Sequence, residues 1–479
     1  MHAPVPEAAI FRLLEASHPA EEWEQSATDV VQAYLQQDEY EIVEGIPLED
    51  NWIATRMQNP WTLEWEFHWM TGEIYGGQKA GAGWHKKVTA VHKDMGMEEG
   101  KNAKSVYITA DKKCKTAVHV DDPITFSRRE KAMLGGVNRA HREWYHHQLG
   151  SHLKLNETEI LTVKSWLDYL SMQISLSKEN KNRISNVPYL FKLLKEKGML
   201  DCNPVKCPIS KDKIKLCAEE AELGMFLDAE QKTQYQADVG NLNWIVETFC
   251  PKLAVTASLL GSRNANPTVS GPSMIKQALR WVRGNLGMCL QSDKDSSGMQ
   301  WYVDADLAGL WAVNGETRSR MGILGMYNGM PFFWKSTWIK AIVTSTAESE
   351  VYALVECVKW VLHFNHVCEE LGIHLEAKTP VWCDATAAIA FLKNIGGPSQ
   401  SKLKHIDLRL SFLGQNMDRI DLNHIDGLQN HANFLTKVLS PIDFEKEGEH
   451  LMSEVELPSS VIEELADVSS RGHGEIQRG

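Results

Sequence analysis

The chain has 479 residues, of which 43% are hydrophobic, so it is long enough for two to four domains with buried cores. Its 50 Lys and Arg residues against 63 Asp and Glu residues give a net charge of −13, which excludes a protein that coats nucleic acid with its whole surface; phosphate contacts need local basic patches. The nine cysteines include no Cys-x-x-Cys pair, no apolar run approaches ~18 residues and the N-terminus lacks a signal-peptide pattern, which together predict a reduced, soluble, intracellular protein.

The first predicted elements are a helix and a strand that leads into a second helix. Residues 6–17 carry apolar side chains at helical spacing, and an acidic stretch follows. Residues 27–35, ATDVVQAYL, have the strand-to-helix pattern, with Asp29 after the strand and Tyr34 five positions later. An acid at a helix start also interacts favourably with the helix dipole, and the residues alone leave this alternative open.

A glycine-rich segment, YGGQKAGAGW at residues 75–84, follows an aromatic-rich stretch. By itself such a segment predicts only a flexible connection, and it is not a phosphate cradle.

The next segment, KTAVHVDDPITFSR at residues 115–128, places Asp121 and Asp122 in the middle of an apolar run. The apolar residues alternate with the period of a strand pair: Val118, Val120, Ile124 and Phe126. Two adjacent carboxylates repel each other, and a hard divalent ion such as Mg²⁺ takes oxygen ligands of this kind. An exposed Asp-Asp-Pro turn is the alternative. Pro123 removes a backbone donor where the hairpin returns, which predicts either a distorted bend or an edge position.

The middle of the chain is predicted to be largely helical. Four histidines crowd residues 139–154, but their spacing fits neither a helix pair of metal ligands nor a finger motif. Residues 188–208 form a lysine-bearing helix and its exit, whose basic face suits a duplex backbone or is an ordinary solvated face. Residues 235–284 continue with helical patterns interrupted by one loop rich in Pro, Gly and Ser.

From residue 299 the pattern changes to strands that end in acids. Residues 300–306 end at Asp304 and Asp306, and residues 380–384 end at Asp384. Between them, Ser or Thr followed three residues later by Glu in residues 344–350 is a capping signature for a long helix with a buried apolar stripe. A further helix is expected over residues 385–394, and after residue 441 a loosely attached helix is expected to precede disorder from about residue 467.

Several of these motifs resemble copia-type retrotransposon Pol polyproteins, in the order that the family has them. HVDD at 119–122 is similar to the family's Tyr-Val-Asp-Asp box, residues 75–84 are similar to its Tyr-Gly-Leu-Lys-Gln-Ala-Pro-Arg-Ala-Trp box, and GMLDCNPV at 198–205 is similar to the exit into the thumb. The resemblance runs from about Ala3 to Leu439. It implies an RNA-directed DNA polymerase (reverse transcriptase) joined to a ribonuclease H.

For the polymerase, the resemblance implies a site built from three aspartates. It makes Asp29, Asp121 and Asp122 the catalytic carboxylates and the ligands of Mg²⁺ or Mn²⁺. It also implies substrate-binding residues for the incoming nucleotide: Tyr34, Gln78 and Lys79.

For the ribonuclease H, the matching motifs are DADLAG at 304–309, STAESE at 345–350, Cys-Asp at 383–384 and KHIDLR at 404–409. The resemblance makes three residues catalytic and metal-binding: Asp304, Glu350 and Asp384. Asn433, in ANFLTK, stands where the family has a fourth aspartate, and it is expected to bind metal through its amide oxygen without contributing charge. Asp306 is expected to neighbour the ligand strand, and Glu348 to serve the helix start.

The implied fold is a multidomain mixture of the α+β and α/β classes. Residues 1–220 are expected to hold a reverse transcriptase with truncated fingers, a palm and a thumb, and residues 221–298 a helical connection. Residues 299–440 are expected to form a ribonuclease H-like mixed sheet with flanking helices, and residues 441–479 an acidic, partly disordered tail.

The implied partners are an RNA or DNA template-primer, an RNA–DNA hybrid and deoxynucleoside triphosphates. The implied location is the cytoplasm, in a virus-like particle as in intact relatives, or the nucleus. A catalytically decayed or repurposed remnant that keeps the fold and at most binds nucleic acid is the alternative. The truncated fingers, the altered glycine-rich box, Pro123 and Asn433 favour that alternative. A purely structural interaction protein, in which neither set of acids converges, is a third hypothesis.

Overall fold

The computed structural model of the protein describes residues 7–36, 53–58, 65–70, 80–131, 137–138, 140–293, 298–310, 313, 315–384, 386, 389, 404–427 and 429–476. It is a mixed α/β structure with several sheets, as the sequence predicts. Within the described residues, no helix combines the length and the apolar character needed to cross a membrane. The chain forms two compact units: Met1–Glu7, Ala20–Leu161 and Glu370–Gly372 in unit 1, and Ala8–Pro19, Thr162–Glu369 and Ile373–Gly479 in unit 2.

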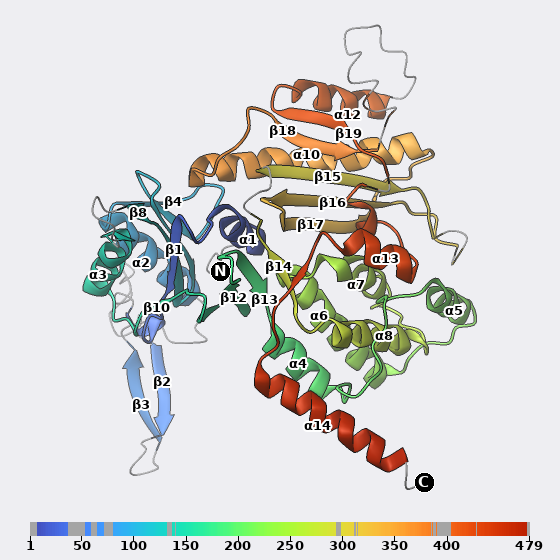
Figure 1. Ribbon diagram of the computed structural model, residues 1–479, viewed down its shortest axis with the longest axis horizontal. Coiled ribbons are helices and arrows are strands. Elements are labelled where there is room, and N and C mark those ends of the chain that lie inside the picture. Colours follow the sequence, from blue (N-terminus) through green and yellow to red (C-terminus); the bar gives the residue numbers. More distant parts are fainter. Residues whose placement is uncertain are drawn as a thin grey trace. The chain divides into compact units, whose positions relative to one another are not determined.

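Unit 1 is built on a six-stranded antiparallel sheet with the strand order β10-β1-β7-β6-β5-β4 (Figure 1). Its strands are β1 (Trp23–Ala27), β4 (Met97–Glu99), β5 (Val106–Thr109), β6 (Cys114–His119), β7 (Asp122–Arg128) and β10 (Glu159–Ile160). Two short hairpins accompany it: β2 (Ile53–Gln58) with β3 (Trp65–Met70), and β8 (Glu130–Lys131) with β9 (Val137–Asn138).

The core of unit 1 lies between this sheet and the helices α2 (Ala80–Asp94) and α3 (Ala140–His152). Trp84 and Val88 of α2 and Tyr145 of α3 are buried against Cys114 and Val118 of β6. The sheet therefore has a rigid apolar support beneath the hairpin that bears the paired aspartates.

The hairpin β6–β7 confirms the strand pair predicted for residues 115–128. His119 pairs with Asp122, so Val120 and Asp121 form a two-residue turn. Pro123 lies opposite Val118 without a register shift in the hairpin, and its carbonyl accepts a hydrogen bond from the Thr28 backbone N–H at 3.3 Å. The proline is thus accommodated in an interior strand, contrary to the expectation of an edge position, and the bend before it has a positive φ at Val120.

Unit 2 contains a second antiparallel sheet with the order β11-β12-β13-β14-β20, and a set of helices. The strands are β11 (Trp166–Tyr169), β12 (Met172–Leu176), β13 (Asn182–Ser185), β14 (Met288–Gln291) and β20 (Ser453–Glu454). The helices are α1 (Ala8–Ser17), α4 (Val187–Glu196), α5 (Lys211–Glu222), α6 (Ala229–Thr248), η3 (Pro251–Leu253), α7 (Ala254–Gly261) and α8 (Gly271–Gly284). They include the helices predicted for residues 6–17 and 235–284.

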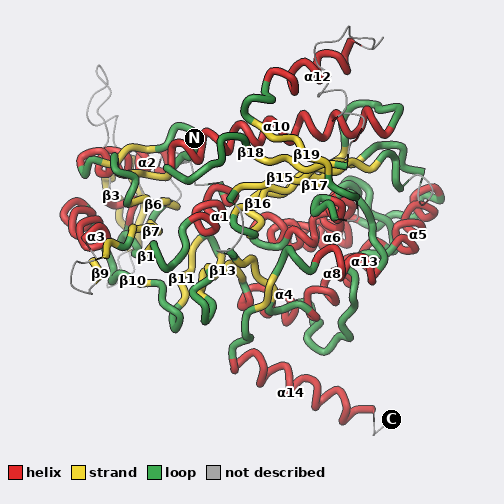
Figure 2. Tube along the Cα trace, turned by 45° about the horizontal axis from the view of Figure 1, so that its top comes forward, coloured by secondary structure: helices red, strands yellow, loops and turns green. Residues whose placement is uncertain are grey.

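The third sheet, also in unit 2, is mixed and has the order β17-β16-β15-β18-β19 (Figure 2). Its strands are β15 (Met299–Asp306), β16 (Arg320–Tyr327), β17 (Met330–Trp338), β18 (Thr379–Cys383) and β19 (Ile420–His424). The pairs β15–β16 and β16–β17 are antiparallel, whereas β15–β18 and β18–β19 are parallel. The strands predicted around residues 300–306, 321–327 and 380–384 are all present.

Helix α10 (Thr346–Leu371) packs on this mixed sheet through aromatic side chains. Its Phe364 ring lies 5.7 Å from the Trp301 ring of β15 and 5.0 Å from the Phe332 ring of β17, measured between ring centroids. At its start, the Thr344 backbone N–H donates to the Glu348 carboxylate at 2.7 Å, and the Glu348 N–H donates to the Ser345 hydroxyl at 3.2 Å. This is the predicted capping arrangement, and it fixes where the helix begins.

The C-terminal elements are α12 (Lys404–Gln415), η4 (Asn433–Leu435), α13 (Pro441–Gly448), β20 and α14 (Ser459–Ile476). Strand β20 pairs with β14, so the described chain after residue 441 contributes to a sheet as well as to two helices. Of the helix expected over residues 385–394, only positions 386 and 389 lie within the described residues.

Candidate functional site

The first group of acids, which we call the hairpin cluster, consists of Asp29, Asp121 and Asp122. Asp29 follows β1, and Asp121 and Asp122 occupy the turn and the first position of β7, the neighbouring strand. The backbone N–H of Val30 donates to the carbonyl of Asp121 at 2.8 Å. Residues 92 positions apart in sequence are thereby held side by side, a grouping that the resemblance to copia-type proteins implied.

The hairpin cluster is electrostatically strained in the absence of a cation. Partial loss of hydration, then the charges of Asp121 and Asp29, raise the pKa of Asp122 to about 6. Asp29 and Asp121 are therefore close enough to Asp122 for their charges to oppose its ionisation.

The turn itself has an unfavourable backbone conformation. Val120 has φ of 55°, which a β-branched residue rarely adopts, so the surroundings must impose it. The buried Trp84 indole N–H donates to the Val120 carbonyl at 2.5 Å. The last residue of the glycine-rich box thus holds the turn that presents Asp121.

Asn156, after α3, fixes Asp29 from the other side. Its side-chain amide donates to the Asp29 carboxylate at 2.5 Å, and its backbone N–H donates to the Asp29 carbonyl at 2.9 Å. The sequence analysis missed Asn156 and the contact of Trp84 because neither lies near the acids in sequence. Tyr34 lies in the short helix η1 (Ala33–Gln36), but its side chain is outside the described residues, as are Gln78 and Lys79.

The second group, which we call the sheet cluster, consists of Asp304, Glu350 and Asp384. Strands β15 and β18 are parallel, with Tyr302 opposite Trp382. Two residues further along each chain are Asp304 and Asp384, which therefore belong to the same face of adjacent strands. Glu350 is the fifth residue of α10. Three separate elements supply the three acids.

Burial and the charges of neighbouring acids raise the pKa values of Glu350 and Asp384 in this cluster as well. Burial, followed by the charges of Asp384 and Asp304, raises the pKa of Glu350 to about 7. Burial and the charge of Asp304 likewise raise the pKa of Asp384. These electrostatic interactions show that Asp304, Glu350 and Asp384, which the resemblance implies for one site, lie near one another.

Asp304 is the most enclosed of the three acids, with 4% of its surface exposed. Its carboxylate accepts a hydrogen bond from the Thr436 hydroxyl and lies 3.6 Å from the Lys437 ammonium. Both residues follow the short helix η4, and the sequence analysis did not assign them a role. The TK pair of ANFLTK was visible in the sequence, but only the fold shows that it meets Asp304.

Asn433 is 6% exposed and borders the sheet cluster. Its amide oxygen accepts a hydrogen bond from Lys437, and its NH₂ group donates to Glu447 Oε1 at 3.1 Å. Of the two neighbouring acids, Asp306 pairs with Arg320 in the sheet register, and Glu348 caps α10 as predicted.

Both clusters fit a divalent cation by their charge. Each contains a carboxylate whose pKa is raised by burial and by the charges of two neighbouring acids, and an ion with oxygen ligands would relieve that repulsion. In the sheet cluster, Lys437 already supplies one positive charge at Asp304. Among the described residues, no three His, Cys, Asp or Glu side chains stand in a ready-made coordination arrangement.

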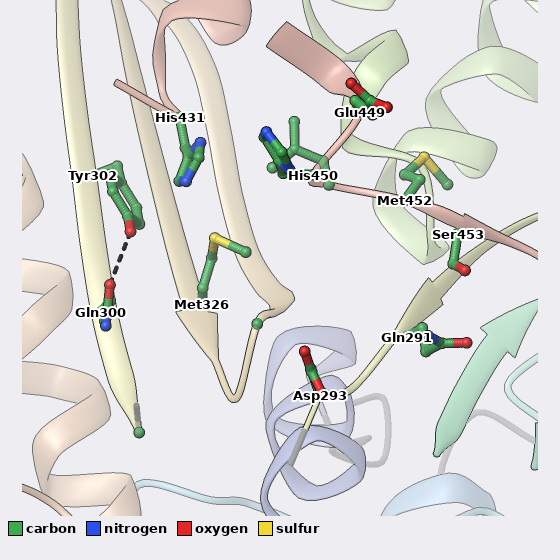
Figure 3. Close-up of a pocket in the computed structure, with 13 residues that line it drawn as sticks. Gln291, Asp293, Gln300, Tyr302, Met326, His431, Glu449, His450, Met452 and Ser453 are labelled. Atoms are coloured by element: carbon green, nitrogen blue, oxygen red, sulfur yellow. Dashed lines mark hydrogen bonds between the residues drawn. The ribbon is translucent and has the colours of Figure 1, made fainter. Parts of the chain in front are cut away.

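A separate cavity of about 590 Å³ lies in unit 2 (Figure 3). His431 and His450 line it, with ring centroids 5.9 Å apart, and His431 packs on Tyr302 at 4.6 Å. The Tyr302 hydroxyl donates to Gln300 Oε1 at 2.8 Å. These residues share no sequence motif, so the sequence analysis gave no signal for the cavity.

Part of the chain, including strands β1, β6 and β7, is similar to a known protein family. Residues 1–211 match the family model described as reverse transcriptase (RNA-dependent DNA polymerase). Over these residues the chain is similar to reverse transcriptases, and its similarity to plant transposon Pol polyproteins supports the copia type.

Plant transposon proteins are similar to more than half of the chain. The retrovirus-related Pol polyprotein from transposon TNT 1-94 of Nicotiana tabacum is 28% identical over 292 residues, which cover 60% of this chain and 21% of that protein. The Pol polyprotein from transposon RE2 of Arabidopsis thaliana is 26% identical over 310 residues, covering 60% and 20%. The chain thus spans about a fifth of the length of these curated relatives.

Two solved structures align with 84% of this chain. A foamy viral protease-reverse transcriptase in complex with dsDNA is 13% identical, with 68% of its chain covered and a TM-score of 0.20. The dRH form of that protein in complex with ds DNA is 10% identical, with 59% covered and a TM-score of 0.22. TM-scores this low carry no argument about fold or ligands.

Proposed function

We propose that the chain is an RNA-directed DNA polymerase with a ribonuclease H, from a copia-type retrotransposon Pol polyprotein. The hairpin cluster is the polymerase centre and the sheet cluster the nuclease centre. Residues 1–220 supply the reverse transcriptase with palm and thumb, 221–298 the connection, 299–440 the ribonuclease H-like domain and 441–479 the tail. An RNA or DNA template-primer, an RNA–DNA hybrid and deoxynucleoside triphosphates are the ligands.

One observation carries this proposal: each unit brings carboxylates from distant segments close enough for their charges to help raise the pKa of another acid in the same cluster. In unit 1, Asp121 and Asp29 help to raise the pKa of Asp122, and in unit 2, Asp384 and Asp304 help to raise that of Glu350. An ordinary Asp-Asp-Pro turn or solvated helix start does not require a third acid from a distant segment. A paired set of such clusters suits two phosphoryl-transfer centres.

At the polymerase centre, Asp29, Asp121 and Asp122 hold the metal ions. Bound Mg²⁺ or Mn²⁺ supplies activation of the primer 3′ hydroxyl and neutralisation of the triphosphate charge. Asn156 orients the Asp29 carboxylate, and Trp84 keeps the Val120 turn in its strained form. The packed support of the sheet limits movement of the acids during reaction.

At the nuclease centre, Asp304, Glu350 and Asp384 bind the cations that assist hydrolysis of the RNA strand. Thr436 orients the buried Asp304 carboxylate, and Lys437 reduces the repulsion around it. The parallel register of β15 and β18 keeps Asp304 and Asp384 on one face.

A catalytically decayed remnant is the second candidate function. The observation that favours it is the position of Asn433, whose amide oxygen is engaged by Lys437. An amide at this position supplies no negative charge, which weakens cation binding. Such a chain keeps the fold and at most binds nucleic acid.

Primer extension and cleavage of the RNA in a hybrid, both with Mg²⁺, test the proposal on the whole chain. We expect activity in both assays. Asp121→Asn is expected to abolish extension and preserve cleavage, and Asp384→Asn to abolish cleavage and preserve extension, because the clusters belong to different units.

Matched controls are Asp94→Asn in unit 1 and Asp418→Asn in unit 2, exposed acids outside both clusters, which should leave both activities intact. A folded wild-type chain that is inert in both assays supports the remnant instead.

A further inference from the structure

The segment that follows the short helix η4 brings a positive charge, that of Lys437, to the sheet cluster. Gly322 of β16 is the cross-strand partner of Asp304. A Cβ atom at Gly322 would lie 2.7 Å from Leu435 Cβ and 2.9 Å from the Ala432 carbonyl oxygen, so η4 rests directly on the sheet beside Asp304. Lys437 comes two residues after the end of η4, and close packing of the backbone therefore sets its position.

The Lys437 ammonium lies between one acid and one amide. It is 3.6 Å from Asp304 Oδ2 and donates a hydrogen bond to the Asn433 amide oxygen. The Asn433 NH₂ group donates to Glu447 Oε1 at 3.1 Å, which fixes the end of the amide that faces the lysine. The Lys437 side chain is 37% exposed, whereas that of Asp304 is 2% exposed. An ammonium has three N–H donors, so Lys437 can also donate to an anion that approaches from solvent.

The charge of Lys437 acts on more than one acid of this region. Burial and then the charge of Asp304 raise the pKa of Asp384, and Lys437 opposes that rise. Burial also raises the pKa of Asp306, and Lys437 opposes this rise too. When ionised, the three carboxylates of the sheet cluster and this ammonium sum to a charge of −2, which one divalent ion balances. An aspartate at position 433, as in the family that the chain resembles, would hold the ammonium between two acids, whereas Asn433 accepts its hydrogen bond without neutralising it.

We propose that the Lys437 ammonium takes the place of a second divalent ion at the nuclease centre and is a catalytic residue that contacts the phosphate of the RNA strand. In the hydrolysis, a water oxygen bonds to phosphorus, the bond from phosphorus to the 3′ oxygen breaks, and that oxygen receives a proton from the water. The ammonium offsets the negative charge on the phosphate oxygens during this exchange. Asn433 is a positioning residue that aims the ammonium. This inference rests on the proposed nuclease centre.

The number of Mn²⁺ ions bound to the full-length chain, measured by the electron paramagnetic resonance of free Mn²⁺, tests the inference without an activity assay. The parent and all variants in this experiment carry Asp121→Asn, which suppresses binding at the hairpin cluster. We expect the parent to lose about one equivalent of bound Mn²⁺ when Asp384→Asn is added. Asn433→Asp combined with Lys437→Met should bind about one equivalent more than the parent, because it exchanges an ammonium for a carboxylate and so creates a site for two ions.

Cleavage of the RNA in a hybrid tests the catalytic role of the ammonium. Lys437→Met should lower the cleavage rate by about a hundredfold, and Lys437→Arg by less than about tenfold, because a guanidinium keeps the charge. At low Mg²⁺ the rate should rise in proportion to the Mg²⁺ concentration for wild type, and more steeply for Asn433→Asp combined with Lys437→Met. The matched control is Lys446→Met, an exposed lysine of α13, which should cleave like wild type. Thermal unfolding in EDTA verifies that each variant folds.

The possible failures are separable. If Asp384→Asn removes about two equivalents of Mn²⁺ from the parent, or if Lys437→Met cleaves like wild type, Lys437 does not replace an ion although the nuclease centre stands. If Asp384→Asn changes neither Mn²⁺ binding nor cleavage, the proposed nuclease centre fails, and the inference fails with it. A folded wild-type chain that cleaves no hybrid overturns the catalytic role of Lys437 together with the proposed nuclease activity.

Discussion

At the scale of single residues, the acids of the sheet cluster make the fold less stable when they ionise. Burial and the charges of Asp384 and Asp304 raise the pKa of Glu350 from 4.5 to about 7. A group with a raised pKa in the folded state favours folding below its unfolded pKa of 4.5, and this contribution is lost as the pH rises through 7. Without metal, ionised Glu350 therefore works against folding at neutral and alkaline pH.

We predict that Glu350→Gln raises the melting temperature of the metal-free protein at pH 8 by about 1–3 °C. The difference should shrink as the pH falls through 7 and disappear near 4.5, where wild-type Glu350 is protonated. Differential scanning calorimetry in EDTA measures it. Glu356→Gln on the same helix, which removes a carboxylate paired with Lys359 at 2.6 Å, should give no such pH-dependent gain. Equal melting temperatures of Glu350→Gln and wild type at pH 8 would contradict the claim that ionised Glu350 destabilises the metal-free protein.

Lys437 is expected to stabilise the sheet cluster, whereas ionised Glu350 destabilises it, because Lys437 places a positive charge beside the buried Asp304. We predict that Lys437→Met lowers the free energy of unfolding of the metal-free protein by roughly 1–3 kcal/mol, since Asp304 loses its charged partner. Saturating Mg²⁺ should recover part of this loss by replacing the ammonium charge. Urea denaturation with and without Mg²⁺ measures both effects, and the exposed Lys446→Met serves as the control. A loss that Mg²⁺ does not reduce would contradict this role.

At the scale of elements, the close packing of α10 on the mixed sheet depends on a glycine in β16. A Cβ atom at Gly325 would lie 2.9 Å from Phe332 Cζ and 3.0 Å from Trp301 Cη2. Both rings are fully buried, and Phe364 of α10 packs against them, so neither has space to withdraw.

We predict that Gly325→Ala destabilises unit 2 by about 1–3 kcal/mol through overpacking. Gly240→Ala is the comparison, because a Cβ at this position in α6 meets nothing within 4 Å. That change should stabilise the helix by roughly 0.5–1 kcal/mol. Denaturant unfolding measures the change in the free energy of unfolding, which should be negative for Gly325→Ala and positive for Gly240→Ala. If Gly325→Ala leaves the free energy of unfolding unchanged, the aromatic cluster can rearrange.

At the scale of the whole molecule, the chain does not fold as consecutive blocks. Helix α1 lies between two segments of unit 1 in sequence, Met1–Glu7 and Ala20–Leu161, but belongs to unit 2. Its buried Arg12 donates to the carbonyls of Phe332 at 2.9 Å and Thr248 at 2.9 Å, and lies over the Trp334 ring at 4.0 Å. Burial lowers the pKa of Arg12 to about 9, with the charge of Glu247 opposing the shift.

We predict that Arg12→Ala destabilises unit 2 by about 2–4 kcal/mol, because buried carbonyls lose a charged donor. Hydrogen exchange should therefore accelerate in β17 and α6 and remain unchanged in β6 and β7. The exposed Arg128, which lies 3.7 Å from Glu22, provides the control Arg128→Ala with little effect on either unit. Equal acceleration in both units would argue against the separate stability of unit 2.

The sequence by itself determined the local elements and the acids at their ends. Period-two alternation predicts the β6–β7 hairpin, and the capping pattern before Glu348 predicts the start of α10, because both depend on neighbouring residues. The resemblance to copia-type proteins added the grouping of distant acids, which local patterns do not contain. The family model that residues 1–211 match is that of reverse transcriptases.

Only the tertiary structure decided which distant residues complete each cluster. Asn156 reaches Asp29, Trp84 holds the Val120 turn, and Glu447 approaches Asn433, although no sequence spacing connects these pairs. The interior position of Pro123 likewise depends on β1 lying beside β7. Such contacts arise from strand order and helix packing. The residues that make them have no regular spacing along the chain, so sequence periodicity cannot predict them.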